Sequence, residues 1–151
     1  MMKGKTMKKI IYIMCFMALP VCAQIMDTPC AGGSGVVVKG KLKGEYCMSD
    51  KGIGNWWNAV SWCDAQGKQL VSMSDDCGCD IYEGGCGRSD SQDGYPCPNF
   101  SLTGRNINEW IWMQDATSAS SVHSVKLDNA KSWPQYRSGN MFNQTTYAMC
   151  K

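Results

Sequence analysis

Residues 55–73 read NWWNAVSWCDAQGKQLVSM, and this stretch predicts one short helix, a glycine stop and a buried strand. Asn55 is a suitable N-cap, because its side-chain oxygen can accept one of the backbone N–H groups that lack a partner at a helix start. An apolar stripe at helical period follows, made of Trp56, Ala59, Val60 and Cys63. Gly67 supplies the left-handed residue that commonly ends a helix. The predicted strand contains Leu70, Val71 and Met73.

The first 23 residues have the features of a secretory signal peptide. Four lysines precede an apolar run over Ile10–Leu19, and the small residue Ala23 precedes the expected cleavage point. The run is too short to span a bilayer, which takes about 20 apolar residues. A lipoprotein signal with Cys22 as the lipidated residue is the alternative, although Val21 is bulky for such a signal. We therefore expect a protein that is secreted, periplasmic or on the cell surface.

Cleavage after residue 23 would leave a flexible segment over 24–35 and one domain over 36–151. It would also change the formal net charge from +2 to −2, because the signal carries four lysines and no acid. No basic cluster is expected in the mature chain, so the phosphate contacts of a nucleic-acid-binding protein are not indicated. We expect no nucleic-acid partner and no membrane span after cleavage.

The cysteines of the mature chain indicate disulfides. The chain has 10 cysteines, and the even set left after cleavage is typical of a small exported domain. These are Cys30, Cys47, Cys63, Cys77, Cys79, Cys86, Cys97 and Cys150. A zinc site is not expected, because no second close pair and no nearby histidine accompanies Cys77 and Cys79.

Three of the cysteine pairings can be expected from their positions in the sequence. Cys30 and Cys47 flank two short predicted strands, Val36–Val38 and Lys41–Cys47, around Gly40, and we expect them to pair because they are close in the sequence. In the glycine-rich segment that follows Met73, we expect one bridge between Cys77 and Cys97 and another between Cys79 and Cys86. Ser74 is expected to cap a short helical turn that begins at Asp75 and Asp76.

The segment between Cys77 and Cys97 is also rich in acids. Asp90-Ser-Gln-Asp93-Gly94 is loosely similar to a calcium loop, since calcium is bound by several oxygen ligands on a flexible turn. The alternating ligands and the closing glutamate of an EF-hand are missing. The preferred interpretation is a solvated acidic loop, and no metal site or cofactor is predicted.

The C-terminal half contains three predicted strands, over residues 110–113, 122–127 and 147–150. Between the last two, residues 132–144 are expected to form a polar loop whose aromatic and amide side chains suit a sugar or a protein surface. The candidate binding residues are Trp133, Tyr136, Arg137, Asn140, Asn143 and Gln144. The alternative is that Trp133 and Phe142 fill the core. Asn99 and Asn143 begin glycosylation sequons, which matter only in a eukaryotic secretory host.

This succession of motifs resembles the C-type lectin-like domain. In the helix region the matching positions are Trp57, Ala59, Trp62, Cys63, Gly67, Leu70 and Val71. Residues 110–113, Trp-Ile-Trp-Met, are similar to the family's central Trp-Ile-Gly-Leu strand with Trp112 in place of the glycine, and the chain closes with Tyr-Ala-Met-Cys150. The resemblance covers about 36–151 and is greatest to compact bacterial members with a shortened C-terminal half.

The resemblance implies an α+β fold: a small disulfide-rich domain with one main helix packed on short antiparallel strands. It also implies that Cys63 pairs with Cys150 in the last strand. The calcium motifs of sugar-binding members are missing, because Pro98-Asn99 precedes the central strand and Leu127-Asp128-Asn129 is only faintly similar to the second motif. Calcium-dependent sugar binding is therefore not implied, since a fold alone does not define a function.

The sequence contains no catalytic constellation. His123, the single histidine, falls in a predicted strand with no nucleophile or acid placed beside it by a motif, so a half-exposed strand residue is expected. The G-x-S-x-G, P-loop and H-E-x-x-H patterns are absent. We therefore do not expect an enzyme.

Two hypotheses from different functional classes follow. The first is a secreted or cell-surface recognition module that binds a protein or glycan without calcium. The second is a structural envelope or pilus-associated protein that uses the fold as a disulfide-bonded scaffold. Among the helix tryptophans Trp56, Trp57 and Trp62, not all can face inward, and an exposed one would be a plausible contact.

Overall fold

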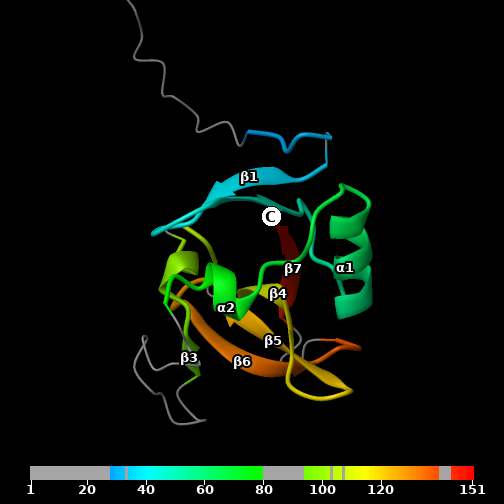
Figure 1. Cartoon of the computed structure of the whole chain (residues 1–151), viewed down its shortest axis with the longest axis vertical. Helices are drawn as coiled ribbons and strands as arrows, with labels where there is room; N and C mark the ends of the chain where they lie inside the picture. Colours follow the sequence, from blue (N-terminus) through cyan, green and yellow to red (C-terminus); the bar gives the residue numbers. More distant parts are fainter. Residues whose placement is uncertain (1–27, 33, 80–93, 103, 107, 140–143) are drawn as a thin grey trace, which may run out of the picture.

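The computed structural model describes residues 28–32, 34–79, 94–102, 104–106, 108–139 and 144–151. Within these residues the fold is mixed α+β, with two α-helices and a seven-stranded sheet of order β1-β2-β7-β4-β5-β6-β3. The elements are β1 (Val36–Lys39), β2 (Glu45–Met48), α1 (Trp56–Asp64), α2 (Met73–Asp76), β3 (Tyr95–Pro96), the 3₁₀ helix η1 (Pro98–Phe100), β4 (Glu109–Ala116), β5 (Ser121–Lys126), β6 (Lys131–Tyr136) and β7 (Thr145–Cys150). Figure 1 shows the β1–β2 hairpin at the top, α1 at the right beside β7, and β3 at the lower left.

Several predictions fall outside the described residues. They concern the signal peptide over 1–23, residues 24–27 and 33 of the segment 24–35, the calcium-like loop over 90–93, and four single residues. Those residues are Cys86, Asn140, Phe142 and Asn143.

Helix α1 begins as predicted. Asn55 has extended backbone geometry, and its side-chain oxygen accepts a hydrogen bond of 2.8 Å from the backbone N–H of Asn58. Ala59 and Cys63 of the apolar stripe are fully buried. Gly67 has the expected left-handed conformation, with φ of +66°. A substitution there would be strained, because residues with a Cβ disfavour positive φ.

The strand predicted over residues 70–73 is wrong. Leu70 makes an isolated bridge with Cys150, and Met73 already lies in α2. The N-cap of α2 is Ser72, whose hydroxyl accepts from the N–H of Asp75, so the cap predicted at Ser74 is also wrong. The Ser72 hydroxyl gives a partner to a backbone N–H that would have none at a helix start, and this favours a helix over a continued strand.

The sheet has one apolar cluster on each face. On one face Trp112, Val122 and Ala148 pack with Ala59 and Cys63 of α1. The cluster on the opposite face includes Met73, Phe100, Ile111, Met113, Val125 and Met149. β4 joins the two halves of the sheet, because it pairs antiparallel with β5 and parallel with β7. The predicted strands 110–113, 122–127 and 147–150 are thus present, with bounds shifted by a few residues.

The structure confirms three predicted disulfides. Cys30 is bonded to Cys47, and Cys77 to Cys97. Cys63 of α1 is bonded to Cys150 of β7, the pairing that the family resemblance implied. Cys79 is also disulfide-bonded, and its predicted partner is outside the described residues. Structural disulfides persist in oxidising compartments, so these bonds are compatible with a secreted protein.

Two predictions about β5 and β6 are wrong. Residues 131–136 form β6, whereas a polar loop was expected from residue 132 onward. His123 in β5 was expected to be half-exposed, but only 8% of its surface is accessible. Both differences have one cause: β6 pairs with β5 along its whole length, and the pair covers the imidazole that a loop would have left open.

Candidate functional site

The predicted binding residues are distributed over two faces of β6. Trp133 is opposite Ser124 and Tyr136 is opposite Ser121 in the β5–β6 register. Because successive side chains of a strand point to opposite faces, two residues three apart lie on different faces. Trp133 is half-buried against Trp110, with ring centroids 5.6 Å apart, whereas Tyr136 is 53% exposed. The structure therefore does not bring Trp133 and Tyr136 together in one platform.

Arg137 directly follows β6 and is fixed through its backbone. Its N–H donates to the carbonyl of Ser120 at 2.9 Å, and its carbonyl accepts from the N–H of Trp56 at 2.9 Å. The second bond ties the end of β6 to the start of α1. The guanidinium of Arg137 lies over the Trp56 ring, with Cζ 4.6 Å from the ring centroid, which is a cation–π distance. Nη2 also donates to the carbonyl of Ser118 at 3.4 Å.

Trp56 is in turn anchored to the sheet. Its indole N–H donates to the carbonyl of Met113 at 2.9 Å. The neighbouring Trp57 contacts it edge-on, with centroids 6.4 Å apart, and is itself 51% exposed. One tryptophan of α1 thus supports Arg137 while the next presents its ring to solvent.

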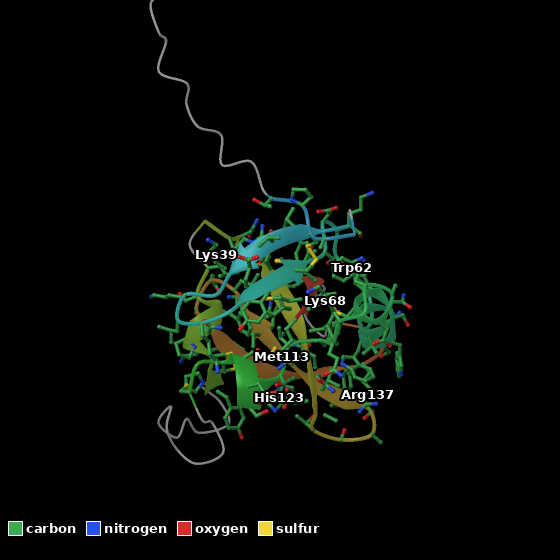
Figure 2. The ribbon with its side chains drawn as sticks, turned by 45° about the horizontal axis from the view of Figure 1, so that its top comes forward. Lys39, Trp62, Lys68, Met113, His123 and Arg137 are labelled. Carbon is green, nitrogen blue, oxygen red and sulfur yellow. A yellow bond between two sulfur atoms is a disulfide. The ribbon has the colours of Figure 1, made fainter. Side chains whose placement is uncertain are left out.

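A groove of about 380 Å³ opens beside this stack. We call it the Trp56–Arg137 groove, and its lining residues are Trp56, Val60, Asp64, Gln69, Leu70, Gln114, Ala116 and Arg137. In Figure 2, Arg137 lies at the lower right of the molecule, near the same edge as α1. The groove is therefore built from α1, the segment after it, β4 and the end of β6.

The polar groups of the groove are of complementary kinds. Gln69 and Gln114 are exposed amides on fixed backbone, since Gln69 exchanges hydrogen bonds with Lys151 and the N–H of Gln114 donates to Val71. Asp64 provides a carboxylate and Arg137 a cation. The Nε of Arg137 is buried and has no hydrogen-bond partner within the described part of the chain. Amide, acid, cation and aromatic groups together suit a polyhydroxylated ligand, which carries both donors and an apolar ring face.

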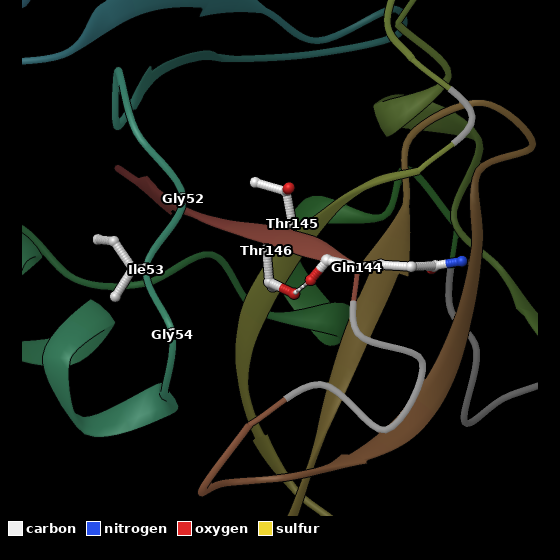
Figure 3. A pocket seen from close by; sticks show the side chains of 6 residues that line it. All are labelled: Gly52, Ile53, Gly54, Gln144, Thr145 and Thr146. Atoms are coloured by element: carbon white, nitrogen blue, oxygen red, sulfur yellow. Dashed lines mark hydrogen bonds between the residues drawn. The ribbon is translucent and has the colours of Figure 1, made fainter.

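Gln144 lies in a different, smaller hollow of about 230 Å³. Figure 3 shows the segment 52–54 running alongside the start of β7, with Gln144 directed away from that segment. A Cβ on Gly52 would lie 2.5 Å from the Thr145 methyl, so the Thr145 side chain leaves no room for a side chain at residue 52. The other lining side chains are Ile53, Thr145 and Thr146. This hollow offers fewer polar groups than the Trp56–Arg137 groove.

Asn99 serves the fold and not a surface. It is completely buried, its Oδ1 accepts from the N–H groups of Leu42 and Lys43, and its Nδ2 donates to the carbonyl of Asp76 and to the hydroxyl of Tyr46. The sequon that begins at Asn99 therefore has no accessible amide in the folded protein. Every hydrogen-bonding position of the side chain is occupied.

A charged cluster closes the C-terminus onto α2. The Nζ of Lys151 lies 2.7 Å from a carboxylate oxygen of the buried Asp76 and 3.0 Å from one of Asp75. Burial lowers the pKa of Lys151, but the hydrogen bonds to these acids outweigh burial, and the pKa is raised. The bond with Lys151 lowers the pKa of Asp75. The single ammonium of Lys151 is shared by two carboxylates, and these ion pairs hold the last strand against α2.

His123 lies on the face of the sheet opposite α1. Its Nδ1 is 2.8 Å from the hydroxyl of Ser132, and its ring contacts that of Tyr95 edge-on. Burial lowers the pKa of His123 below its usual value, and Asp115 opposes this effect only in part. Ser132 is fully buried, so this hydroxyl is not open to a substrate.

Comparison with known proteins adds no assignment: no family model matches the chain, and no curated protein is found to be similar to it. Within the described residues no group of three or more histidine, cysteine or acidic side chains could hold a metal ion. No helix among them is long and apolar enough to cross a membrane. Of the predicted binding residues that the structure describes, the groove contains Arg137 alone. Sequence reasoning missed Gln69 and Gln114, which no motif marks.

Proposed function

We propose that the chain is a secreted or cell-surface recognition module of C-type lectin-like fold, which binds a glycan without calcium in the Trp56–Arg137 groove. The family assignment is supported by the order of the sequence motifs and by the disulfide between Cys63 and Cys150. The same bond holds α1 against β7 and so keeps one wall of the groove in place.

The observation that carries the proposal is the stack of Arg137 on Trp56 in the groove; the exposed ring of Trp57, which contacts Trp56, can extend the contact beyond the groove lining. Pyranose rings present an apolar C–H face and a rim of hydroxyls. An indole packs against the face, while a guanidinium and amides bind the rim. Gln69 and Gln114 place such amides at the groove.

The size of the groove favours a glycan over a folded protein as its occupant. Its volume of about 380 Å³ lies within the range of about 300–1,000 Å³ that is usual for small-ligand sites. A stable protein interface covers about 800 Å² on each partner. The groove is thus large enough for the terminal sugars of a glycan. A folded protein would need a much wider contact surface, and a flat one would not enter the groove.

Calcium independence rests on the sequence, since neither calcium motif of the sugar-binding C-type lectins is present in its place. Among the described residues, Asp64 is the one carboxylate that lines the groove. Calcium takes six to eight oxygen ligands, commonly from several carboxylates. The groove therefore depends on Arg137 and the amides for polar recognition.

The test is a glycan array probed with oxidised mature protein, with and without chelator, followed by calorimetry on the best ligand. Hydrogen bonds to a charged group contribute about 1.5–3 kcal/mol each. We therefore expect Arg137→Gln to weaken binding by about tenfold or more, and Trp57→Ala to weaken it as well. Arg137→Lys should fail to restore affinity, because an ammonium lacks the planar fork.

The matched controls are Tyr95→Ala, an exposed aromatic residue elsewhere, and Arg105→Gln, an arginine paired with Glu109. Both should retain full affinity. Absence of saturable binding to any glycan would overturn the proposal in favour of the structural scaffold. Loss of binding in chelator would overturn the calcium independence, and full affinity of Arg137→Gln would place the site elsewhere.

A further inference from the structure

The tip of the β1–β2 hairpin combines an exposed aliphatic side chain with three cations. Residues 39–44 read KGKLKG, and Lys39, Lys41 and Lys43 are all exposed. Leu42 is 58% exposed, which makes it the most exposed large hydrophobic residue of the described chain. The expectation that the mature chain lacks a basic cluster does not hold at this hairpin.

Asn99 of η1 holds the tip of the hairpin in one conformation. Asn99 accepts from the backbone N–H groups of Leu42 and Lys43 at 2.8 Å each, and its own carbonyl accepts from the N–H of Lys41 at 2.8 Å. Gly40 has no room for a side chain, because a Cβ there would lie 2.2 Å from the carbonyl oxygen of Lys43. A tip fixed in advance loses little conformational entropy when it binds.

The lysines of the tip are free of ion pairs within the described residues. The salt bridges there involve Arg105, Lys126 and Lys151, and none involves the three lysines of the tip. Glu45 is opposite Lys39 in the β1–β2 register and is the nearest acid on the hairpin itself. The tip as a whole, residues 39–45, therefore carries an excess of positive charge.

We propose that this tip docks on an anionic lipid surface, with its lysines at the headgroups and Leu42 in the interfacial layer. An aliphatic side chain between ammonium groups matches the interface of such a bilayer, where charge and apolar burial are both available. A soluble polyanion would engage the lysines equally but would gain nothing from an exposed leucine. The leucine is thus the feature that selects a lipid surface.

Docking by the tip would leave the proposed glycan site accessible. Figure 2 places Lys39 at the upper left and Arg137 at the lower right, and Figure 1 shows α1 on the side away from the tip. A module attached through the hairpin would therefore present the Trp56–Arg137 groove away from the lipid. The lipid proposal does not depend on the glycan proposal, because it uses different residues.

The test is sedimentation of oxidised mature protein with phosphatidylcholine vesicles, with and without phosphatidylglycerol. A lysine near an anionic membrane contributes about 1 kcal/mol, or about fivefold in affinity. We therefore expect Lys41→Gln with Lys43→Gln to weaken binding about 25-fold, and Leu42→Ser to weaken it about tenfold or more. The control, Lys51→Gln with Lys68→Gln, removes the same charge elsewhere and should change affinity less than twofold.

Three outcomes would overturn the proposal. The first is equal binding to neutral and anionic vesicles, or no binding to either. The second is an equal loss for the control pair, which would indicate a diffuse charge effect. The third is full binding by Leu42→Ser, which would show that the tip recognises anions without entering a lipid layer. Glycan binding by the same samples reports separately on the groove.

Discussion

Replacing Asn99 by alanine removes one buried side chain with four hydrogen-bond partners. Two of the partners, the N–H groups of Leu42 and Lys43, belong to an exposed turn and can bond to water instead. The other two are buried: the carbonyl of Asp76 loses its amide donor, and the hydroxyl of Tyr46 keeps only its role as a donor. The loss is therefore concentrated at two of the four bonds.

The magnitude follows from these two buried partners. A buried polar group left without its partner costs about 1–3 kcal/mol. The carbonyl of Asp76 is expected to lie in the middle of this range, at about 2 kcal/mol, and the partly satisfied Tyr46 hydroxyl at its lower end, at about 1 kcal/mol. We expect Asn99→Ala to lower the free energy of unfolding by about 3 kcal/mol, a large fraction of the stability of a small domain.

The assay is urea unfolding of the oxidised protein, followed by tryptophan fluorescence, with the six tryptophans as reporters. The matched control is Asn106→Ala, because the exposed Asn106 makes one local bond, from the N–H of Asn108. The control should lose less than about 1 kcal/mol. A loss at Asn99 no greater than at Asn106 would refute the reasoning, since it would mean that water or relaxation satisfies the buried partners.

Two further predictions concern the disulfides and the buried histidine. The Cys63–Cys150 bridge spans 87 residues and the Cys77–Cys97 bridge spans 20. By loop entropy, replacing both cysteines of a bridge by alanine should lower the free energy of unfolding by about 4–5 kcal/mol for the first bridge and about 3 kcal/mol for the second. Urea unfolding measures both losses, and the reverse order would contradict this account. The lowered pKa of His123 means that the unfolded chain binds the extra proton, so stability should fall as pH drops through the unfolded value of about 6.5 and level off below the folded pKa. His123→Asn does not titrate and should flatten this part of a melting-temperature profile, and an unchanged slope would assign it to other groups.

The parts of the fold that the sequence predicts well have strong local patterns. The α1 helix has a cap, a helical stripe and a left-handed glycine within one short stretch, and the structure contains all three. β4 was found because Trp110–Met113 is apolar on both faces, as a central strand is. The parallel pairing of β4 with β7 has no local pattern, because it joins segments that are distant in the chain.

β6 was missed for an identifiable physical reason. Pro134 argues against a strand, since proline cannot donate a backbone hydrogen bond. In the described part of the sheet, β3 pairs only with Lys131 and Ser132, so Pro134 has a neighbouring strand on one side alone. The missing N–H can therefore face away from the sheet at little cost. Such a position depends on the length of a neighbouring strand and cannot be recognised from β6 itself.

The error about β6 also explains the partial success at the candidate site. A loop would have allowed Trp133, Tyr136 and Arg137 to turn toward one ligand, whereas a strand sends Tyr136 to the opposite face. Arg137 shares the α1 face with Trp133 but lies just past the strand, where the N–H of Trp56 can bond to its carbonyl. The binding hypothesis thus rests on a residue that the sequence singled out and on a partner, Trp56, that was assigned to the core. If glycan affinity depends on both residues, α1 has two roles: it closes the apolar core through Cys63 and supports the guanidinium through Trp56.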